Sequence, residues 1–277
     1  MFNWVPHTAA RSENRGAVTG TTSGTTITAA GSANTKGNYT DIGGTTSFDY
    51  EWIVVVIGNG SPGGSAADYV LDLAINVGGN RFIVAEDLRY SNIRAAAEQW
   101  DIYSLPLHIP SGSQLSARCA ASVASTNFQV VIIGYSSGPL GAPGYSRCRA
   151  FYTPTSSRGI NCDPGAVAHT KTRTQIIAST PDRAVALMAY VGPNADISAS
   201  ATRWLFDIEY GAAGSEQVIL PNLYLGRGAP YDIPTSKVFG PYPCDIQAAS
   251  RMSVNIQSHV TTDGDRDVDV ALWGFVP

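Results

Sequence analysis

Apolar residues recur at every second position in several short stretches of the chain. In SQLSARCAAS, residues 113–122, the apolar Leu115, Ala117 and Cys119 are separated by polar or small residues. The stretch RDVDVALWG, residues 266–274, begins with the same period. A two-residue period is typical of an antiparallel strand with one face in a core and the other toward water.

Glycine and proline divide the apolar stretches into short segments. DYEWIVVVIG, residues 49–58, is rich in β-branched and aromatic residues and is followed by the turn sequence NGSPGG. The one acceptable helix candidate is NIRAAAEQW, residues 92–100, which would span about two turns. A parallel α/β sheet would need crossover helices that the rest of the chain does not supply. The pattern instead predicts an all-β fold of the sandwich or jelly-roll type.

The chain also repeats its own pattern of apolar, acidic and turn residues. The aligned blocks are residues 69–88 with 204–223, residues 105–122 with 242–259, and residues 128–135 with 268–275. Identities are few, but the order, spacing and turn positions of the blocks agree, and Gly134 matches Gly274. Self-similarity of this kind indicates a structural unit that occurs twice. We therefore predict two tandem, jelly-roll-like antiparallel β-sandwiches that arose by internal duplication.

These blocks divide the chain into four parts. Residues 1–45 form a Gly/Thr-rich N-terminal arm, and residues 46–137 form the first β-sandwich. Residues 138–172 form a connector rich in Pro, Gly, Ser and Arg, and residues 173–277 form the second β-sandwich. The arm by itself has the composition of a disordered segment, so we expect that its own domain, a symmetry mate or a larger assembly orders it. Thr-rich runs such as TTITA can add a strand to the sheet edge of a neighbour, and we predict that the arm binds neighbouring subunits.

The charge of the chain and the length of its apolar runs argue against two kinds of partner, nucleic acid and a membrane. Only 14% of the residues are charged, the formal net charge is −4, and Lys and Arg form no cluster, so we expect no nucleic-acid partner. The longest apolar run, residues 52–57, is too short to span a bilayer, so we expect no membrane insertion. Residues 1–15 lack the basic and apolar regions of a secretory signal, so we expect a protein made in a cytoplasm.

The cysteines favour reduced thiols and no metal centre. No two of Cys119, Cys148, Cys162 and Cys244 have the Cys-x-x-Cys spacing of a zinc site, and no histidine lies close to them in the sequence. Reduced thiols are the expectation in a cytoplasm, although a disulfide between Cys148 and Cys162 stays open.

Other metal ligands are equally sparse, and we predict no cofactor. The four histidines, His7, His108, His169 and His259, are scattered through different predicted elements. The acidic turn from Asp263 to Asp269 could hold calcium, but it lacks the glycine and glutamate of an EF-hand loop. A solvated acidic hairpin is the favoured interpretation of that turn.

One stretch matches the pattern of a serine hydrolase. Gly134-Tyr135-Ser136-Ser137-Gly138 fits G-x-S-x-G, and Asp196 and His259 would complete a triad with Ser136. The motif needs a helix directly after it, whereas Gly138 to Gly144 contains two prolines and three glycines. We therefore interpret GYSSG as the end of a strand.

Acidic residues could also be paired for glycoside hydrolysis. The candidates are Glu51, Glu86 and Asp87 in the first sandwich and Asp207 and Glu209 in the second. Nothing in the sequence selects one pair. Asp72 and Asp207 occupy the same position of the repeat, which predicts a structural role such as a hydrogen bond at a strand edge. The chain is therefore predicted not to be an enzyme.

Aromatic residues and arginines around the connector are candidates for contacts with a partner. They are Tyr135, Tyr145, Arg147, Arg149 and Tyr152, and Trp4 near the start of the chain forms a further apolar candidate. Tyrosine and arginine, with serine and glycine, are enriched in rigid but adaptable contact surfaces. The alternative is that this segment packs between the two sandwiches.

Three stretches carry a family resemblance. TTITAAGSANTKGNYTDIG, IPSGSQLSAR and DRDVDVALWGF resemble virion structural proteins of tailed bacteriophages, of the head- or tail-associated appendage, spike or decoration type. The second copy departs from this pattern at Ala248 and Ala249 and has Asn255 where the first has Arg118. The resemblance implies no catalytic residue. It implies a virion component that forms homo-oligomers, contacts other virion proteins and attaches to a host surface. The alternative is an appendage that binds or degrades polysaccharide.

Overall fold

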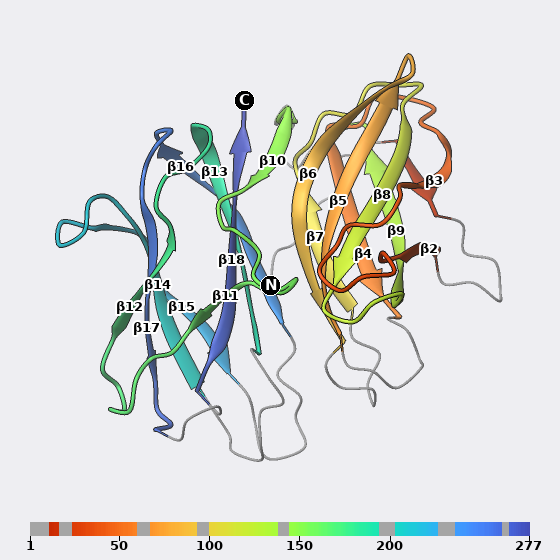
Figure 1. Ribbon diagram of the computed structural model, residues 1–277. Helices are drawn as coiled ribbons and strands as arrows, with labels where there is room; N and C mark the ends of the chain where they lie inside the picture. The colour runs from red at the N-terminus through yellow and green to blue at the C-terminus, as the bar shows by residue number, and fades with distance from the viewer. Residues whose placement is uncertain are drawn as a thin grey trace. The chain divides into compact units, whose positions relative to one another are not determined.

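The computed structural model consists of β-strands and loops, with no helix among the residues that it describes. These are residues 11–16, 24–59, 67–92, 100–137, 144–193, 203–226, 236–261 and 266–277. Accordingly, no described helix has the length and apolar character needed to cross a membrane. The chain divides into two compact units, residues 1–149 with 275–277 and residues 150–274. The all-β prediction is confirmed (Figure 1).

The first sheet of the first unit is built around β9. This strand (Asn127–Tyr135) pairs antiparallel with β1 (Ser12–Arg15), β2 (Thr25–Thr28) and β4 (Trp52–Gly58). Strand β4 pairs in turn with β7 (Trp100–Leu105). Strands β1 and β2 both lie along β9, so the sheet has four strand positions in the order β1/β2, β9, β4, β7.

The second sheet of this unit has the order β3, β8, β5, β6. Its strands are β3 (Thr40–Thr45), β8 (Gln114–Ala121), β5 (Asp68–Val77) and β6 (Asn80–Ser91). All three contacts between neighbours are antiparallel, and β10 (Arg147–Ala150) adds one parallel bridge to β6. Two four-stranded antiparallel sheets whose chain crosses repeatedly from one to the other constitute a jelly roll.

The second unit has the same strand order. Its first sheet contains β11 (Ile160–Cys162), β18 (Val268–Val276), β13 (Ala184–Pro193) and β16 (Lys237–Ile246). Its second sheet contains β12 (Thr172–Ile177), β17 (Met252–Ser258), β14 (Arg203–Tyr210) and β15 (Gln217–Gly226). Each strand of the second unit takes the place of one strand position of the first.

The strand registers follow the alignment of the repeats. Leu71 pairs with Leu88, and the aligned Phe206 pairs with Leu223. Both units therefore place aligned residues at the same points of their sheets. The jelly-roll architecture is observed in both, whereas their origin by duplication stays a prediction.

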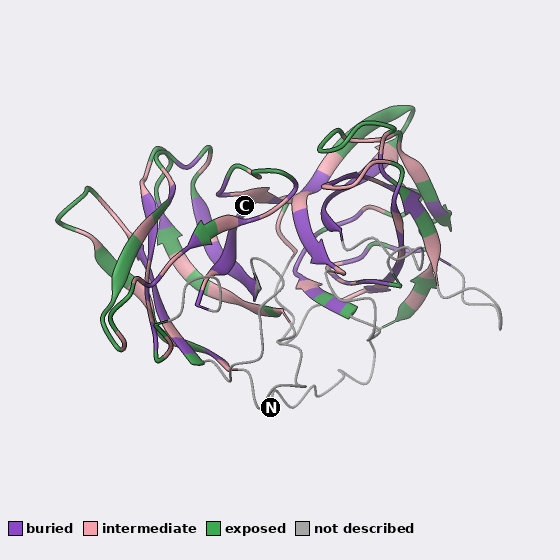
Figure 2. Cartoon of the chain, turned by 60° about the horizontal axis from the view of Figure 1, so that its bottom comes forward, coloured by how far each residue is buried: buried purple, intermediate pink, exposed green. Residues whose placement is uncertain are grey.

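The inner faces of the sheets form the core of each unit, as Figure 2 shows in purple. In the first unit, Tyr69 packs edge-on against Phe128 with ring centroids 5.0 Å apart. The aligned residue in the second unit is Trp204, which is fully buried and donates its indole N–H to the Arg266 carbonyl at 2.6 Å. That hydrogen bond lets a large ring with a polar atom occupy a core position without an unsatisfied donor.

The first unit extends further toward the N-terminus than the predicted sandwich. Residues 12–15, 25–28 and 40–45, which the sequence analysis assigned to the arm, are β1, β2 and β3 of its sheets. The edge of β9 supplies the hydrogen-bond partners that a Gly/Thr-rich segment cannot supply for itself. Likewise, β10 and β11 lie within the predicted connector. Residues 93–99 of the predicted helix lie outside the described residues, and Trp100 begins β7.

All four cysteines are free. Burial raises the pKa of the Cys119 and Cys162 thiols to about 12, which keeps both protonated and unreactive. Cys148 and Cys162 belong to different units and form no disulfide in the structure.

The repeated glycine at the end of β9 is required for packing. A Cβ added at Gly134 would lie 2.3 Å from the Tyr50 ring, and one at Gly274 would lie 2.2 Å from the Phe151 ring. We expect Gly134→Val to lower the free energy of unfolding by about 1–3 kcal/mol, as overpacked cores do. Urea denaturation would measure the change. Gly31→Val is the control, since no atom lies within 4 Å of that position; equal stability of the two variants would contradict the prediction.

Candidate functional site

A buried carboxylate lies at the centre of the second sheet in the first unit. Asp72 on β5 is 1% exposed and accepts hydrogen bonds from Lys36 Nζ at 2.6 Å and Arg118 Nε at 2.9 Å. The backbone N–H of Asp87 on β6 donates to the same carboxylate at 3.2 Å. Asp87 has φ 48°, so the carboxylate also fixes an unusual backbone conformation.

The second unit contains the same arrangement at the aligned positions. Asp207 on β14 accepts hydrogen bonds from Lys171 Nζ and from the backbone N–H of Asn222, the latter at 2.8 Å. Asn222 lies in the left-handed region with φ 52°. A strand carboxylate, a lysine and a left-handed residue therefore recur together. These contacts confirm the structural role predicted for Asp72 and Asp207.

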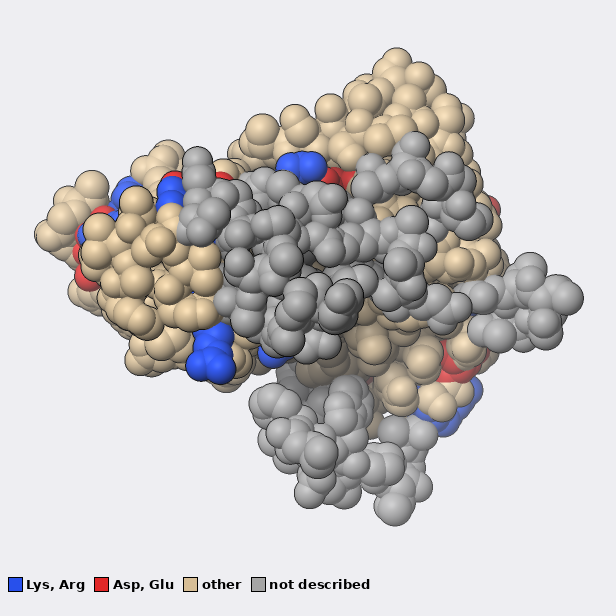
Figure 3. Space-filling view, turned by 90° about the horizontal axis from the view of Figure 1, so that it is seen from below, with Lys and Arg blue, Asp and Glu red and all other residues tan. Residues whose placement is uncertain are grey.

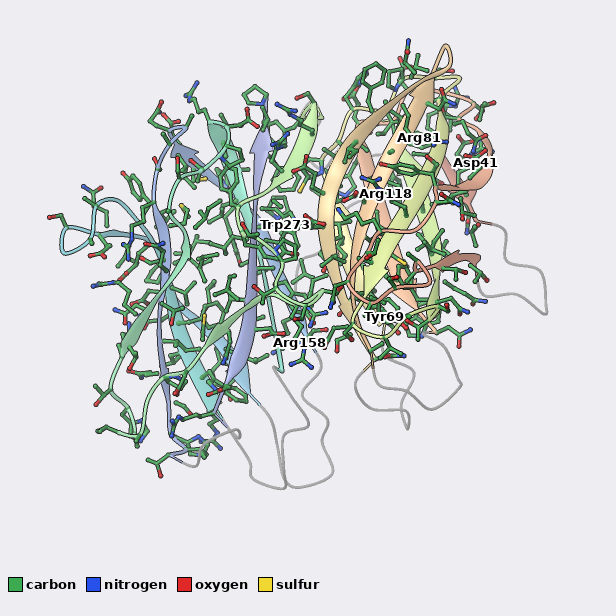
Figure 4. All side chains as sticks on the ribbon, viewed as in Figure 1. Asp41, Tyr69, Arg81, Arg118, Arg158 and Trp273 are labelled. Carbon is green, nitrogen blue, oxygen red and sulfur yellow. The ribbon has the colours of Figure 1, made fainter. Side chains whose placement is uncertain are left out.

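The surroundings of Asp72 are rich in charge but balanced. Lys36 also lies 2.6 Å from the Asp87 carboxylate. Burial alone would lower the pKa of Lys36, but the two carboxylates outweigh it and raise that pKa. The guanidinium groups of Arg81 and Arg118 lie over the Tyr39 ring, 4.4 and 4.7 Å from its centroid. Figure 4 shows both arginines on this sheet. We call the ion-paired group of Lys36, Arg118, Asp72 and Asp87 the ionic clamp.

The acids nominated for glycoside hydrolysis all have partners. Their contacts are Glu51 with His108 at 2.9 Å, Glu86 with Arg149 at 3.1 Å, Asp87 with Lys36, Asp207 with Lys171, and Glu209 with Arg173 at 2.6 Å. A glycosidase needs two carboxyl groups that face a sugar across a cleft. The described contacts instead tie each of these acids to a neighbouring strand or loop, which favours a structural role for them.

Ser136 lies where β9 ends. Its Oγ accepts a hydrogen bond from the Arg11 backbone N–H at 2.8 Å, and its own N–H donates to the Arg11 carbonyl. These bonds join the start of β1 to the end of β9, as expected for a strand terminus. His259 belongs to the other unit and accepts from the Arg203 N–H at 3.0 Å. Asp196 and residues 138–143 lie outside the described residues.

Within the described ranges, no three His, Cys, Asp or Glu side chains group as metal ligands. Asp263 and Asp265 of the predicted calcium turn lie outside those ranges. Asp267 accepts a hydrogen bond from Asn161 Nδ2 at 3.2 Å, and Asp269 is buried. Calcium binding at this turn stays a prediction.

Two of the residues predicted to contact a partner already pack against other rings of the chain. Tyr145 packs on Phe275 with centroids 5.7 Å apart, and Tyr152 is buried edge-on against Trp273 at 5.6 Å. Of the other predicted contact residues, Tyr135 ends β9, and Arg147 and Arg149 lie on β10. Trp4 lies outside the described residues. Since the Tyr145 and Tyr152 rings already pack within their own units, the partner role of this group stays a prediction.

The first unit also has an apolar surface that was not predicted from the sequence. Ile53, Val55 and Ile57 of β4 are fully buried in the core, so the alternate residues of this strand point outward. We call the outward side of the sheet over β4, β7 and β9 the β4 face. Its apolar side chains are Trp52, Val54, Val56, Trp100, Ile102, Val131 and Ile133, and the same side also carries Ser104, Gln129 and Tyr135. The unbroken apolar run WIVVVI in β4 could have predicted this surface, because a strand that is apolar on both sides typically has both sides covered.

Charged side chains elsewhere occur in mixed groups. Figure 3 shows, on the face that it presents, Lys and Arg beside Asp and Glu, with no broad area of one sign among the described atoms. On the second unit, Arg173 and Arg251 bracket the nearly buried Glu216 at 3.3 and 2.7 Å. We call the surface around these three residues, on the second sheet of the second unit, the ionic sheet surface. The uncharged β4 face is distinct from it.

A pH-dependent contact attaches β1 to its unit. Glu13 accepts hydrogen bonds from Ser47 N–H at 2.9 Å and from the Tyr50 hydroxyl. Burial opposes ionisation of Glu13, but these hydrogen bonds outweigh it and lower its pKa from 4.5 to about 2. The carboxylate therefore stabilises the folded state above pH 4.5, and this contribution is lost as the pH falls toward 2.

We expect Glu13→Gln to be less stable than the wild type above pH 4.5 and the difference to shrink toward pH 2. Denaturation midpoints of both proteins across this interval would measure it. A difference that stays constant over the interval would show that ionisation of Glu13 does not contribute.

Comparison with known proteins gives only remote likenesses. No protein-family model matches the sequence, and a search of curated proteins found no match. Among solved structures, the chain is similar to the crystal structure of the STIV MCP, with 11% identity, a TM-score of 0.35 and coverage of 96% of each chain. It is also similar to the atomic structure of Sulfolobus Turreted Icosahedral Virus, with 11% identity, a TM-score of 0.39 and coverage of 96% of this chain and 90% of that one.

A third solved structure comes from a bacterium. It is the N-terminal CBM22-1-CBM22-2 tandem domain of Paenibacillus barcinonensis Xyn10C, with 11% identity, a TM-score of 0.26 and coverage of 92% of this chain and 94% of that one. At these identities and TM-scores, the likenesses carry no conclusion about function.

Proposed function

We propose that the chain is a non-enzymatic structural component of a virion, which assembles with copies of itself and with other virion proteins. The observation that supports this most is the pair of jelly rolls with one strand order in a single chain. Jelly rolls occur in viral capsid domains and also in lectins and cupins, so the fold alone does not decide the function.

The contacts of the described polar residues agree with a structural role. The nominated acids each pair with a basic residue, and Ser136 joins two strand ends. These residues stabilise the sheets, while the β4 face offers an uncharged surface suited to assembly. A repeated unit also multiplies weak contacts in a symmetric particle.

The finer part of the proposal follows the family resemblance. The chain would be a head- or tail-associated appendage, spike or decoration of a bacteriophage, located in the virion after assembly in the host cytoplasm. It would bind other virion proteins and a host-surface glycan, without nucleic acid, cofactor or membrane insertion.

Electron microscopy of virus particles labelled with an antibody against this chain tests the proposal. Regularly placed label on intact particles is the expected result. Particles from the producing cells that carry no label and no copy of the chain would overturn it. The position of the label would also separate a head component from a tail component.

The second candidate is an appendage that binds or degrades polysaccharide, since jelly rolls also occur in lectins and Phe82 and Tyr224 are exposed rings. Incubation of the protein with host capsule would test it through binding and new reducing ends. Turnover that is lost in a variant of one acidic residue that keeps the wild-type stability would assign enzymatic activity, whereas binding without turnover would assign a lectin-like role.

A further inference from the structure

The β4 face is an uncharged and mainly apolar surface over three strands, which also carries the polar Ser104, Gln129 and Tyr135. Val56 lies between Ile102 on β7 and Val131 on β9, and Val54 lies opposite Ile133. Ile102 is 56% exposed, which is unusual for an isoleucine at the centre of a strand. Strands β4, β7 and β9 place no charged side chain among these outward positions. Surfaces of this kind mark sites of association.

The corresponding positions of the second unit are covered. Val131 of β9 is only 8% exposed, whereas Ile133 is partly exposed; the residues of β18 aligned with them, Ala271 and Trp273, are both fully buried. Within the second unit, Tyr152 packs edge-on against Trp273. The outer side of this sheet is therefore apolar in both jelly rolls, but in the first unit it keeps exposed residues.

We infer that the β4 face binds the β4 face of a second copy of this chain, in a two-fold symmetric dimer. In an isologous dimer the same patch serves both partners, so the patch must be complementary to itself. Two uncharged apolar sheets meet this condition without desolvating a charge, and their association removes apolar area from water. The inference names the partner that the proposed assembly role requires and in that sense rests on it.

The ionic sheet surface of the second unit is a poor alternative partner. Its charged side chains are Lys171, Arg173 and Arg251 with Asp207, Glu209 and Glu216. Covering these groups with valine and isoleucine would remove water from the three partly exposed cations, Lys171, Arg173 and Arg251, without giving them new hydrogen bonds. Association of like faces is therefore favoured over a head-to-tail contact with this surface.

The size of the face sets the strength of the dimer. Three strands about 4.8 Å apart and about six residues long, at about 3.3 Å per residue, cover about 300 Å² on each partner. A standard stable interface buries about 800 Å² on each partner. The isolated contact should therefore be weak and concentration-dependent, and it would become strong only when a particle holds several such contacts together.

Charge substitution at Ile102 tests the dimer. Sedimentation equilibrium of the full chain should show an average mass that rises with concentration from monomer toward dimer. Ile102→Asp and Ile102→Lys should each remain monomeric, because each would place a charge within an apolar contact that offers it no partner. Both variants should keep the wild-type urea midpoint, since Ile102 is an exposed residue.

Val167→Asp is the matched control, because Val167 is 65% exposed but lies outside the β4 face. It should associate like the wild type. A wild-type chain that stays monomeric at every concentration, or Ile102 variants that associate like the wild type, would each overturn the inference. These outcomes are separate from the virion proposal, which fails only if the particles lack the chain.

Discussion

Replacing Arg89 with methionine is expected to lower the free energy of unfolding of the first unit by about 3–5 kcal/mol. Arg89 on β6 is 0% exposed and forms an ion pair with Asp68 on β5, which is almost as deeply buried. Its Nη1 also donates to the Tyr90 carbonyl at 2.8 Å. The variant would remove the Arg89 guanidinium from a buried carboxylate, which costs far more than the loss of an exposed ion pair.

Urea denaturation of the full chain would measure this loss, and the repeat offers a control. Tyr224 occupies the position of Arg89 in the second unit but is 49% exposed. Tyr224→Met should change stability by no more than about 0.5 kcal/mol. The double variant Asp68→Leu/Arg89→Met should recover most of the loss, because neither charge remains buried. A double variant as unstable as Arg89→Met would show that packing, rather than the unpaired charge, causes the loss.

The second large effect is expected at Asp72. Replacing it with alanine should cost about 3 kcal/mol or more, because Lys36, Arg118 and the Asp87 N–H all lose the same buried acceptor. Thermal and urea denaturation would measure the change. Asp207→Ala should lower the stability of the second unit in the same direction, because Asp207 accepts the equivalent bonds from Lys171 and Asn222.

Asp41→Ala is the control for Asp72. Asp41 lies in the same region of the sheet (Figure 4), but its side chain is exposed and its contact with Arg81 is 3.8 Å long. Such surface pairs contribute about 0–1 kcal/mol. If Asp72→Ala were as stable as Asp41→Ala, the clamp around Asp72 would not stabilise the first unit.

The ionic clamp shows how far the repeat could predict a site. The alignment identified Asp72 and Asp207 as equivalent, and it predicted a hydrogen-bonding role for both, which the structure confirms. The cations could not be predicted in the same way. Lys36 and Lys171 come from neighbouring strand regions that are distant along the chain, and only the folded sheets bring them to the carboxylates.

The position of the N-terminal arm, in contrast, could not be predicted from the sequence. Its Gly/Thr-rich composition contains little of the apolar pattern that marks a strand, yet residues 25–28 pair along β9. Edge pairing depends on the hydrogen-bonding groups of the neighbouring strand more than on the side chains of the added one. Composition alone could therefore not place this segment in the first unit.

The sequence by itself determined the all-β class, the occurrence of two similar units and the strand character of the aligned blocks. These properties follow from the two-residue period and from turn residues, which act over short distances along the chain. Only the tertiary structure decided which cation meets which carboxylate, which segments complete the sheets, and which apolar face is left exposed. Each of these depends on side chains and edges brought together from distant parts of the chain, and a local pattern does not contain that information.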